Sequence, residues 1–267
     1  MRPFLFYIGN TAVPAFFPSI MAGALLMTWA AYRLARQRGL SPVAILDMGI
    51  IGILASIVGA RLFHVLVEYP HYYWEDPRRI FYFWQGGFVS LGAFIAAVAG
   101  WLIYFRVRRL SLLPYLDIAG QTCPIIVFFV RLGCLLIGCC YGKPTDFFLH
   151  LTFNHPGATA YHFFPGIPLH ATQPYFMANA VIAFLFLRWL SRRRSFHGQI
   201  TAAFLLYYGI SRFLLEFLRG DADRGLYFHQ SISTGQIVML CFIVAGTLLY
   251  RLAKRRLPIS GIAPTDR

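Results

Sequence analysis

The chain has 267 residues, of which 58% are hydrophobic and only 13% are charged. A soluble globular domain carries roughly 25% charged residues, so this composition excludes an ordinary soluble enzyme, a disordered chain and a coiled coil. It predicts a polytopic membrane protein. The net charge of +14 comes from basic residues in short clusters between long apolar runs. That pattern is typical of membrane topology and not of a nucleic-acid-binding face, so we expect no nucleic-acid partner.

Seven apolar segments are long enough to cross a bilayer, which takes about 20 helical residues. They cover approximately residues 13–33, 43–67, 87–105, 112–136, 172–190, 198–218 and 231–251. The first segment lacks a clear cleavage site and is followed by basic residues, so we interpret it as a retained span and not as a signal peptide. The sequence therefore predicts an all-α integral membrane protein with about seven transmembrane helices, forming a single polytopic membrane domain over residues 1–267.

Arginine and lysine cluster after the first, third, fifth and seventh segments, whereas the alternate loops carry most of the acidic residues outside the spans. By the positive-inside rule, the N-terminus lies outside and the C-terminus is cytoplasmic. The two longer outer segments are residues 68–86, which are rich in aromatic side chains, and residues 143–171, which contain four histidines and four prolines. We expect the first to lie at the membrane interface and the second to be irregular.

Four ionisable residues inside predicted spans stand out: Arg61, Arg131, Arg212 and Glu216. Such residues cost at least about 2.5 kcal/mol each at the bilayer centre. At 1.5 Å of helix rise per residue, the three arginines lie about 20–27 Å from the inner edge of the hydrocarbon core, close to the outer headgroups. Arg212 and Glu216 are four residues apart on one helix face, so we expect Glu216 to hold the guanidinium.

These arginines have two readings. Each one alone could extend to the outer headgroups as an anchor. Three at one depth, one of them with a carboxylate partner, favour a shared anion site, because a guanidinium binds phosphate through two parallel hydrogen bonds. A phospholipid headgroup is the phosphate that lies at this depth. We therefore expect membrane lipid as a ligand.

Glycines surround Arg131 and open the third segment. Gly133 and Gly138 would let a backbone or a lipid approach closely, and Gly142 suits the C-terminal turn of a helix. The pair Gly86-Gly87 precedes the third segment in the same way. Glycines in membrane helices also serve simple packing, so this signal alone leaves both readings open.

The sequence resembles the bacterial prolipoprotein diacylglyceryl transferases, and the resemblance covers nearly the whole chain. The Arg131-x-Gly133, Gly138 and Tyr141-Gly142 pattern is similar to the family signature. A second block runs from Tyr208 to Arg219, with Tyr, Arg and Glu in register. Further similar blocks, in the same order, are Gly59-Ala60-Arg61, Gln85-Gly86-Gly87, His170-Ala171-Thr172-Gln173-Pro174-Tyr175 and Ser233-Thr234-Gly235-Gln236.

The resemblance implies a multi-pass enzyme of the bacterial cytoplasmic (inner) membrane that uses no cofactor and no metal. It would transfer the diacylglyceryl group of phosphatidylglycerol to the lipobox cysteine thiol of an exported prolipoprotein, recognised by its signal peptide. Arg131 and Arg212 would neutralise the phosphate, Glu216 would orient Arg212, and Tyr208 would donate a hydrogen bond. The substrate-binding positions implied are Arg61, Gly86, Gly87, Gly133, Gly138, Gly142, Gln173 and Tyr175.

Several positions depart from the family pattern. Leu91 stands where the family has a histidine, Cys134 replaces an asparagine, and Cys139 replaces an acidic residue. The tyrosine of the first span is replaced by Met21 or Ala22. Because leucine cannot accept a proton, another group must deprotonate the acceptor thiol. His64, three residues after Arg61, is the candidate base, with His170 as the other choice; either could equally be a polar residue satisfied at the interface.

Other functions stay open at this stage. A catalytically altered relative would bind or present phospholipid without transferring it. A redox or metal-binding membrane protein would use Cys134, Cys139 and Cys140, although no CxxC or paired-histidine pattern accompanies them. A channel or transporter would need broken helices and a polar midplane path, which the sequence does not show.

Overall fold

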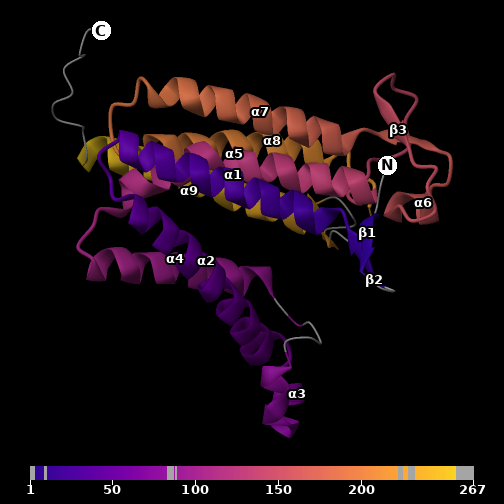
Figure 1. Ribbon diagram of the computed structural model, residues 1–267, viewed down its shortest axis with the longest axis horizontal. Helices are drawn as coiled ribbons and strands as arrows, with labels where there is room; N and C mark the ends of the chain where they lie inside the picture. Colours follow the sequence, from indigo (N-terminus) through magenta and orange to yellow (C-terminus); the bar gives the residue numbers. More distant parts are fainter. Residues whose placement is uncertain are drawn as a thin grey trace. The chain divides into compact units, whose positions relative to one another are not determined.

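The computed structural model describes residues 4–8, 11–82, 87, 89–221, 225–227 and 232–256, and these are mostly helical (Figure 1). Each of the seven predicted segments coincides with a long helix. These helices are α1 (Phe16–Gln37), α2 (Pro42–Phe63), α4 (Ser90–Val107), α5 (Leu112–Ile137), α7 (Thr172–Ser191), α8 (Gln199–Glu216) and α9 (Thr234–Arg256).

Four stretches are long and apolar enough to cross a membrane, among the described residues. They are Pro42–Glu68, Leu112–Ile137, Thr172–Ser191 and Thr234–Arg255. Helix α4 is apolar but shorter over its hydrophobic part, Leu91–Val107. The prediction of an all-α multi-pass membrane protein is therefore confirmed, and the count of seven spans stays a prediction.

Short elements connect the long helices. The strands β1 (Phe4–Ile8) and β2 (Thr11–Pro14) form an antiparallel hairpin before α1. After α2 come a π-helical turn η1 (His64–Glu68), α3 (Pro70–Glu75) and a 3-10 turn η2 (Pro77–Phe81). Between α5 and α7 lie β3 (His150–Thr152), α6 (Thr159–Phe163) and β4 (Pro168–His170), and before α9 lie β5 (Leu226–Tyr227) and β6 (Ile232–Ser233).

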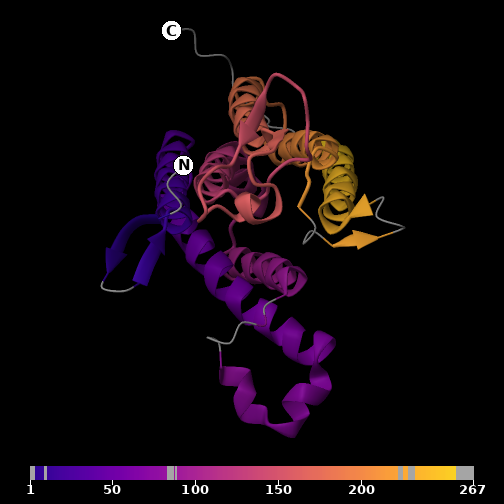
Figure 2. The same ribbon diagram turned by 90° about the vertical axis from the view of Figure 1, so that its right-hand side faces the viewer.

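The chain divides into two compact units, residues 1–30 with 116–267 and residues 31–115. In the first unit α5, α7, α8 and α9 run side by side (Figures 1 and 2). Helices α5 and α8 approach closely at Gly120, where a Cβ atom would lie 3.3 Å from the Cα of Thr201. At the same end Asp117 is fully buried and accepts hydrogen bonds from the backbone of Gly198 and Thr201. A carboxylate from α5 thus caps the N-terminus of α8.

A polar network joins α7 and α8 within the first unit. The side-chain amide of Asn179 donates to Ser211 Oγ over 3.0 Å and accepts from the Tyr207 hydroxyl over 3.0 Å. Side-chain hydrogen bonds of this kind hold membrane helices together where lipid offers no polar partner. They fix the face of α8 that carries Arg212 against α7.

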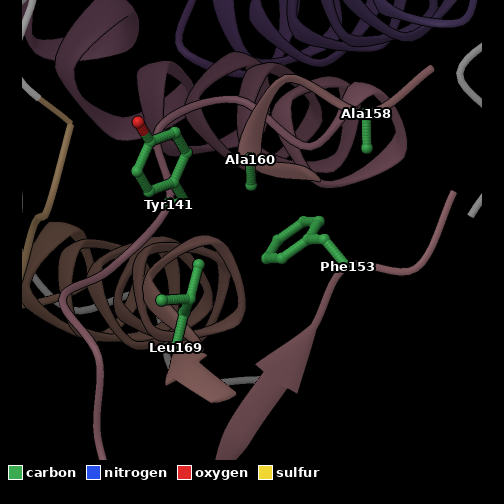
Figure 3. Close-up of a cluster of buried hydrophobic side chains, with 5 residues drawn as sticks. All are labelled: Tyr141, Phe153, Ala158, Ala160 and Leu169. Carbon is green, nitrogen blue, oxygen red and sulfur yellow. The ribbon is translucent and has the colours of Figure 1, made fainter. Parts of the chain in front are cut away.

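The segment 143–171 has its own small core. Tyr141, Phe153, Ala158, Ala160 and Leu169 are buried against one another (Figure 3). The strands β3 and β4 pair antiparallel, with His150 opposite His170. The prediction that this segment is irregular is confirmed, since short elements are joined by turns, and its core ties the segment to the end of α5.

The second unit is built on the contact between α2 and α4. A Cβ atom at Gly59 would lie 2.5 Å from the Gly92 carbonyl oxygen, and one at Gly92 would lie 2.4 Å from that of Gly59. Only glycine permits two helices to touch backbone to backbone. The indole of Trp101 adds a hydrogen bond to the Met48 carbonyl at 2.8 Å.

Candidate active site

Two intramembrane arginines of the first unit converge on one aromatic ring. The Cζ atom of Arg131 on α5 lies 4.4 Å from the centre of the Phe176 ring, and that of Arg212 on α8 lies 4.7 Å from the same centre. Phe176, on the first turns of α7, is 1% exposed. Cation–π contact with a buried ring holds both guanidinium groups in place without using their hydrogen-bond donors. The sequence predicted that Arg61, Arg131 and Arg212 share one anion site. Arg131 and Arg212 do lie on one ring, and the part of Arg61, which belongs to the second unit, stays a prediction.

Arg131 keeps its donors available. Within the described part of the chain its guanidinium makes no hydrogen bond and no ion pair, and the residue is only half-buried. A guanidinium presents five N–H donors in a planar fork that matches a phosphate. Arg131 is therefore arranged to bind an anion.

Arg212, by contrast, is buried and paired. It forms an ion pair with Glu216, as the spacing of four residues predicted. Glu216 is 1% exposed and also lies 3.5 Å from Arg219, and its Oε1 accepts from Ser233 Oγ at 3.0 Å. A buried carboxylate is tolerated only when it is paired and hydrogen-bonded in this way. Glu216 thus anchors the end of α8 to the start of α9.

Arg219 connects the ion pair of Arg212 and Glu216 to a second carboxylate, that of Asp221. Its Nε donates to Asp221 over 2.9 Å, and a second nitrogen pairs with the other oxygen of that carboxylate. Burial would lower the pKa of Arg219, but the hydrogen bonds to Asp221 and the negative charges nearby raise the pKa above its ordinary value. The guanidinium stays charged beside the site.

An apolar hollow of about 210 Å³ lies on the same two helices as Arg131 and Phe176. It is lined by Phe128 on α5 and Ala180 on α7, among others. Phe128 is three residues from Arg131, and Ala180 is four residues from Phe176, so the hollow begins one helical turn from the guanidinium. A cation beside an apolar groove suits a ligand with an anionic head and a hydrocarbon chain.

The turn that ends α5 brings three cysteines together. Gly138 has φ +71°, and the Cys139 N–H donates to the Cys134 carbonyl over 3.1 Å, the 6→1 bond of a Schellman motif. The expectation that Gly142 ends this helix is wrong, because Gly138 already supplies the left-handed residue. The sulfurs of Cys134, Cys139 and Cys140 lie within 4.8 Å of one another.

Cys140 is unusual in its backbone and its charge. Its φ of +56° is in the left-handed region that a non-glycine residue adopts at a cost. Hydrogen bonds from Cys134 and Cys139, together with the guanidinium groups of Arg219 and Arg131, hold the pKa of the Cys140 thiol below its ordinary value. The positive charges of these arginines favour an anion at this sulfur.

The glycines predicted to bind substrate make close backbone contacts. A Cβ atom at Gly133 would lie 2.8 Å from Phe16 Cδ2, and one at Gly138 would lie 2.7 Å from Ala158 Cβ. At Gly142 it would lie 2.4 Å from the His170 carbonyl oxygen. Their small size thus brings α1, the outer segment and β4 to the end of α5, and contact with a substrate stays a prediction.

Gln173 and Tyr175 begin α7 beside this turn. The Gln173 side chain donates to the Cys139 carbonyl over 2.7 Å, and Thr172 Oγ1 donates to the Cys140 carbonyl over 2.8 Å. Gln173 Oε1 is buried without a hydrogen-bond partner among the described residues. The Tyr175 hydroxyl donates to the Leu149 carbonyl at 2.6 Å. Helix α7 thus fixes the cysteine backbone and leaves one amide oxygen for a ligand or water.

In the second unit, Arg61 is 4% exposed and its donors are used within the protein. They reach the backbone carbonyls of Arg79 at 2.6 Å, Ile80 at 3.1 Å, Gly87 at 3.2 Å and Tyr82 at 3.4 Å. The residue ties η2, Tyr82 and Gly87 to the end of α2. Lipid binding by Arg61 stays a prediction.

His64 begins the π-helical turn η1, three residues after Arg61. Its Nδ1 is 3.0 Å from the Tyr73 hydroxyl and its Nε2 is 3.6 Å from Glu68. Gly87, with φ +78°, faces it, because a Cβ there would lie 2.7 Å from His64 Cε1 and 2.9 Å from an Arg61 nitrogen. Gly86 lies outside the described residues. The histidine is thus oriented by a carboxylate and a phenol, which suits a base.

The remaining sequence candidates are placed as follows. Tyr208 stacks on Phe204 with 5.5 Å between ring centres and interacts electrostatically with Arg212. His170 ends β4, and its Nδ1 is buried without a partner among the described residues. Leu91 is 55% exposed, so the position where the family has a histidine carries an apolar side chain on the surface of its unit.

Sequence reasoning missed two components of the site. Phe176 gave no signal, because an aromatic residue in an apolar helix is ordinary. Arg219 could have been found, since it is three residues after Glu216 and shares its face. Ser233 and Gln236, which bond to each other's backbone N–H, were noted only as part of a similar block.

Known proteins agree with this description. The sequence profile of the family described as "Prolipoprotein diacylglyceryl transferase" matches residues 3–252. Proteins named phosphatidylglycerol–prolipoprotein diacylglyceryl transferase are similar along most of their length. The one from Clostridium tetani is 29% identical over 96% of this chain and 99% of its own length. The one from Cupriavidus metallidurans is 30% identical over 95% and 94% respectively. The chain belongs to the prolipoprotein diacylglyceryl transferase family.

Proposed function

We propose that the protein transfers the diacylglyceryl group of phosphatidylglycerol to the cysteine thiol of prolipoproteins, the activity for which its relatives are named. The observation that carries this proposal is the pair Arg131 and Arg212 on the Phe176 ring, next to an apolar hollow. Two arginines beside an apolar groove match a phospholipid, which has an anionic head and hydrocarbon chains, better than they match a soluble anion. The acceptor in this proposal is the lipobox cysteine at the signal peptide.

The reaction needs little covalent chemistry from the protein. The acceptor sulfur attacks the carbon of the diacylglyceryl group that is esterified to phosphate. A carbon–sulfur bond forms there, and the bond from that carbon to the phosphate oxygen breaks. Glycerol phosphate leaves with one more negative charge than the phosphodiester had. Arg131 would bind that phosphate through its unused N–H donors, and Arg212 would stabilise the negative charge that develops on the phosphate.

The other first-unit residues position this pair. Glu216 would orient Arg212, and Arg219, itself paired with Asp221, shares the charge of that carboxylate. Tyr208 is the hydrogen-bond donor proposed for a phosphate oxygen, as predicted from its place one turn before Arg212. Gln173, through its unpaired amide oxygen, is suited to a hydroxyl of the headgroup.

For the second unit the proposed roles are those predicted from sequence. Arg61, Gly86 and Gly87 would contribute to lipid binding, and His64 would accept the thiol proton. The contact of His64 with Glu68 supports the role of base, since a carboxylate partner stabilises the imidazolium that forms. The loop held by Arg61 would keep His64 and Gly87 together.

The proposed topology is the predicted one: a single polytopic domain of seven spans in the bacterial inner membrane, with the N-terminus outside. In this orientation the end of α5 and the start of α7 face outward, where exported prolipoproteins emerge. Fusions of a reporter that is active only outside, made after α4 and after α5, test it. Activity after α5 and none after α4 is expected, and the reverse would contradict the orientation.

Complementation tests the activity. Cells depleted of their own transferase receive this gene, and the mass of a reporter lipoprotein is read by mass spectrometry. We expect a mass increase of one diacylglyceryl group, which a reporter with serine at the lipobox cysteine should not show. An inserted, stable protein that gives no thioether product would refute transfer and favour a relative that only binds lipid.

A further inference from the structure

Three of the chain's five cysteines meet at the outer end of α5. Their sulfur atoms lie within 4.8 Å of one another, and the Cys139 and Cys140 sulfurs are 3.9 Å apart. Sulfur ligands of zinc lie about 2.3 Å from the ion, which puts them about 3.8–4.0 Å from each other. The Cys139–Cys140 pair therefore has the spacing of two thiolates on one ion, and the Cys134 sulfur lies within 4.8 Å of both.

The backbone holds this arrangement in place. The Schellman bond brings the backbone of Cys139 back to that of Cys134. Cys140 takes a left-handed conformation, and the Thr172 hydroxyl fixes its carbonyl. Cysteines that merely fill space in a membrane helix need neither a strained backbone nor side-chain anchors from another helix.

Charge and access also suit a metal. Three thiolates with one divalent cation carry a net charge of −1, and the guanidinium groups of Arg131 and Arg219 interact electrostatically with Cys140. Cys134 is buried, whereas Cys139 and Cys140 are only half-buried. One side of the cluster is thus open, as in catalytic zinc sites, where three protein ligands leave a fourth position for substrate.

We propose that Cys134, Cys139 and Cys140 bind zinc(II) and that the open fourth position takes the acceptor thiol of the prolipoprotein. This inference rests on the proposed function. Coordination to zinc deprotonates a thiol outright, so the metal would activate the acceptor thiol in place of His64, the base predicted from the sequence. Arg131, three residues before Cys134 on the same helix, brings the lipid phosphate to the neighbouring position.

The step balances without an oxidant or reductant. The acceptor thiol binds zinc and releases its proton to water. The zinc-bound sulfur then attacks the glyceryl carbon of phosphatidylglycerol, and the electron pair of the breaking carbon–oxygen bond leaves with glycerol phosphate. The thioether product is a weak ligand, so it dissociates and frees the fourth position.

Metal content of the purified full-length protein gives the first test. After equilibration with zinc and desalting, we expect about one zinc per chain by elemental mass spectrometry. Cys134→Ser, Cys139→Ser and Cys140→Ser should each fall to background. Cys241→Ser, at an exposed cysteine on α9 outside the cluster, is the matched control and should keep its zinc. Wild-type protein without zinc, or with a disulfide among these three thiols, would overturn the proposal.

Cobalt substitution tests the fourth position independently of activity. The cobalt(II) protein should show sulfur-to-metal charge-transfer absorption, which changes when a lipobox peptide with cysteine is added. The same peptide with serine should leave the spectrum unchanged. Identical spectra with both peptides would show that the metal, although bound, does not take the acceptor thiol.

Reversible chelation separates this proposal from the transferase assignment and needs no variant that could misfold. Removing zinc should lower the transfer rate about 10²-fold, the scale that proton-transfer catalysis usually contributes, and adding zinc back should restore the rate. Full transfer by zinc-free protein would overturn the metal proposal and leave the transferase function intact. A zinc-loaded protein whose cobalt form responds to the peptide, but which transfers nothing, would refute the function alone.

Discussion

Arg131 and Arg61 both lie on apolar helices, yet their surroundings are opposite. Arg131 of the first unit is half-buried, rests on the Phe176 ring and makes no hydrogen bond among the described residues. Arg61 of the second unit is 4% exposed and donates to four backbone carbonyls. The comparison teaches that an arginine in a membrane helix either organises the protein or is kept free for a ligand, and that its hydrogen-bond partners distinguish the two.

The largest expected effect comes from removing the open arginine. Arg131→Ala should abolish lipidation, because two charge-assisted hydrogen bonds are worth about 3–6 kcal/mol, or roughly 10²–10⁴-fold in rate. The protein should still insert and unfold at the wild-type temperature in detergent. Arg131→Lys keeps the charge but lacks the fork, and should recover only part of the rate. Normal turnover of Arg131→Ala would show that the arginine is an anchor.

Glu216→Gln should have a smaller effect, and on stability as well as on rate. The change keeps the shape of the side chain and the hydrogen bond to Ser233, but leaves Arg212 buried without its counter-charge. Losing one partner of a buried ion pair costs about 3–5 kcal/mol. Thermal unfolding in detergent measures it. Asp221→Asn removes a less buried partner of Arg219 and should cost less; an equal loss in both would contradict the central place of Glu216.

Substitution of Arg61 should lower stability, whereas substitution of Arg131 should lower the lipidation rate and leave stability unchanged. Arg61→Met leaves the carbonyls of Arg79, Ile80, Tyr82 and Gly87 without this donor, so we expect a loss of about 2–3 kcal/mol in stability and faster proteolysis at η2. The control is Arg78→Met, at an exposed arginine of the same segment, which should change neither. If Arg61→Met keeps its stability and its resistance to proteolysis at η2 but loses lipid binding, Arg61 belongs with Arg131 as a ligand residue.

The sequence predicted what depends on local periodicity. Long apolar runs predicted all seven long helices within a few residues, and the spacing of Arg212 and Glu216 predicted their ion pair. Phe176 could not be predicted, because its role arises only where α5, α7 and α8 meet. The hydrogen bonds from Arg61 to backbone carbonyls and the proximity of the three cysteines depend on the conformation of turns. The type of a single residue does not determine that conformation. The C-terminal turn expected at Gly142 shows the same limit, since the left-handed glycine that follows α5 is Gly138.

The smallest expected effect concerns the backbone of the turn at Cys140, near Arg131. It tests whether this turn needs a side-chain hydrogen bond, as the backbone around Arg61 does. Thr172→Val deletes one hydrogen bond, from the hydroxyl to the Cys140 carbonyl, and should cost about 1 kcal/mol. The left-handed turn at Cys140 should then open more often, so a thiol reagent should label that cysteine roughly fivefold faster. Thr172→Ser keeps the hydroxyl and should behave as wild type. Equal labelling rates in the valine and serine variants would mean that Gln173 and the Schellman bond hold the turn by themselves, and that the threonine hydroxyl matters little to the geometry around Arg131.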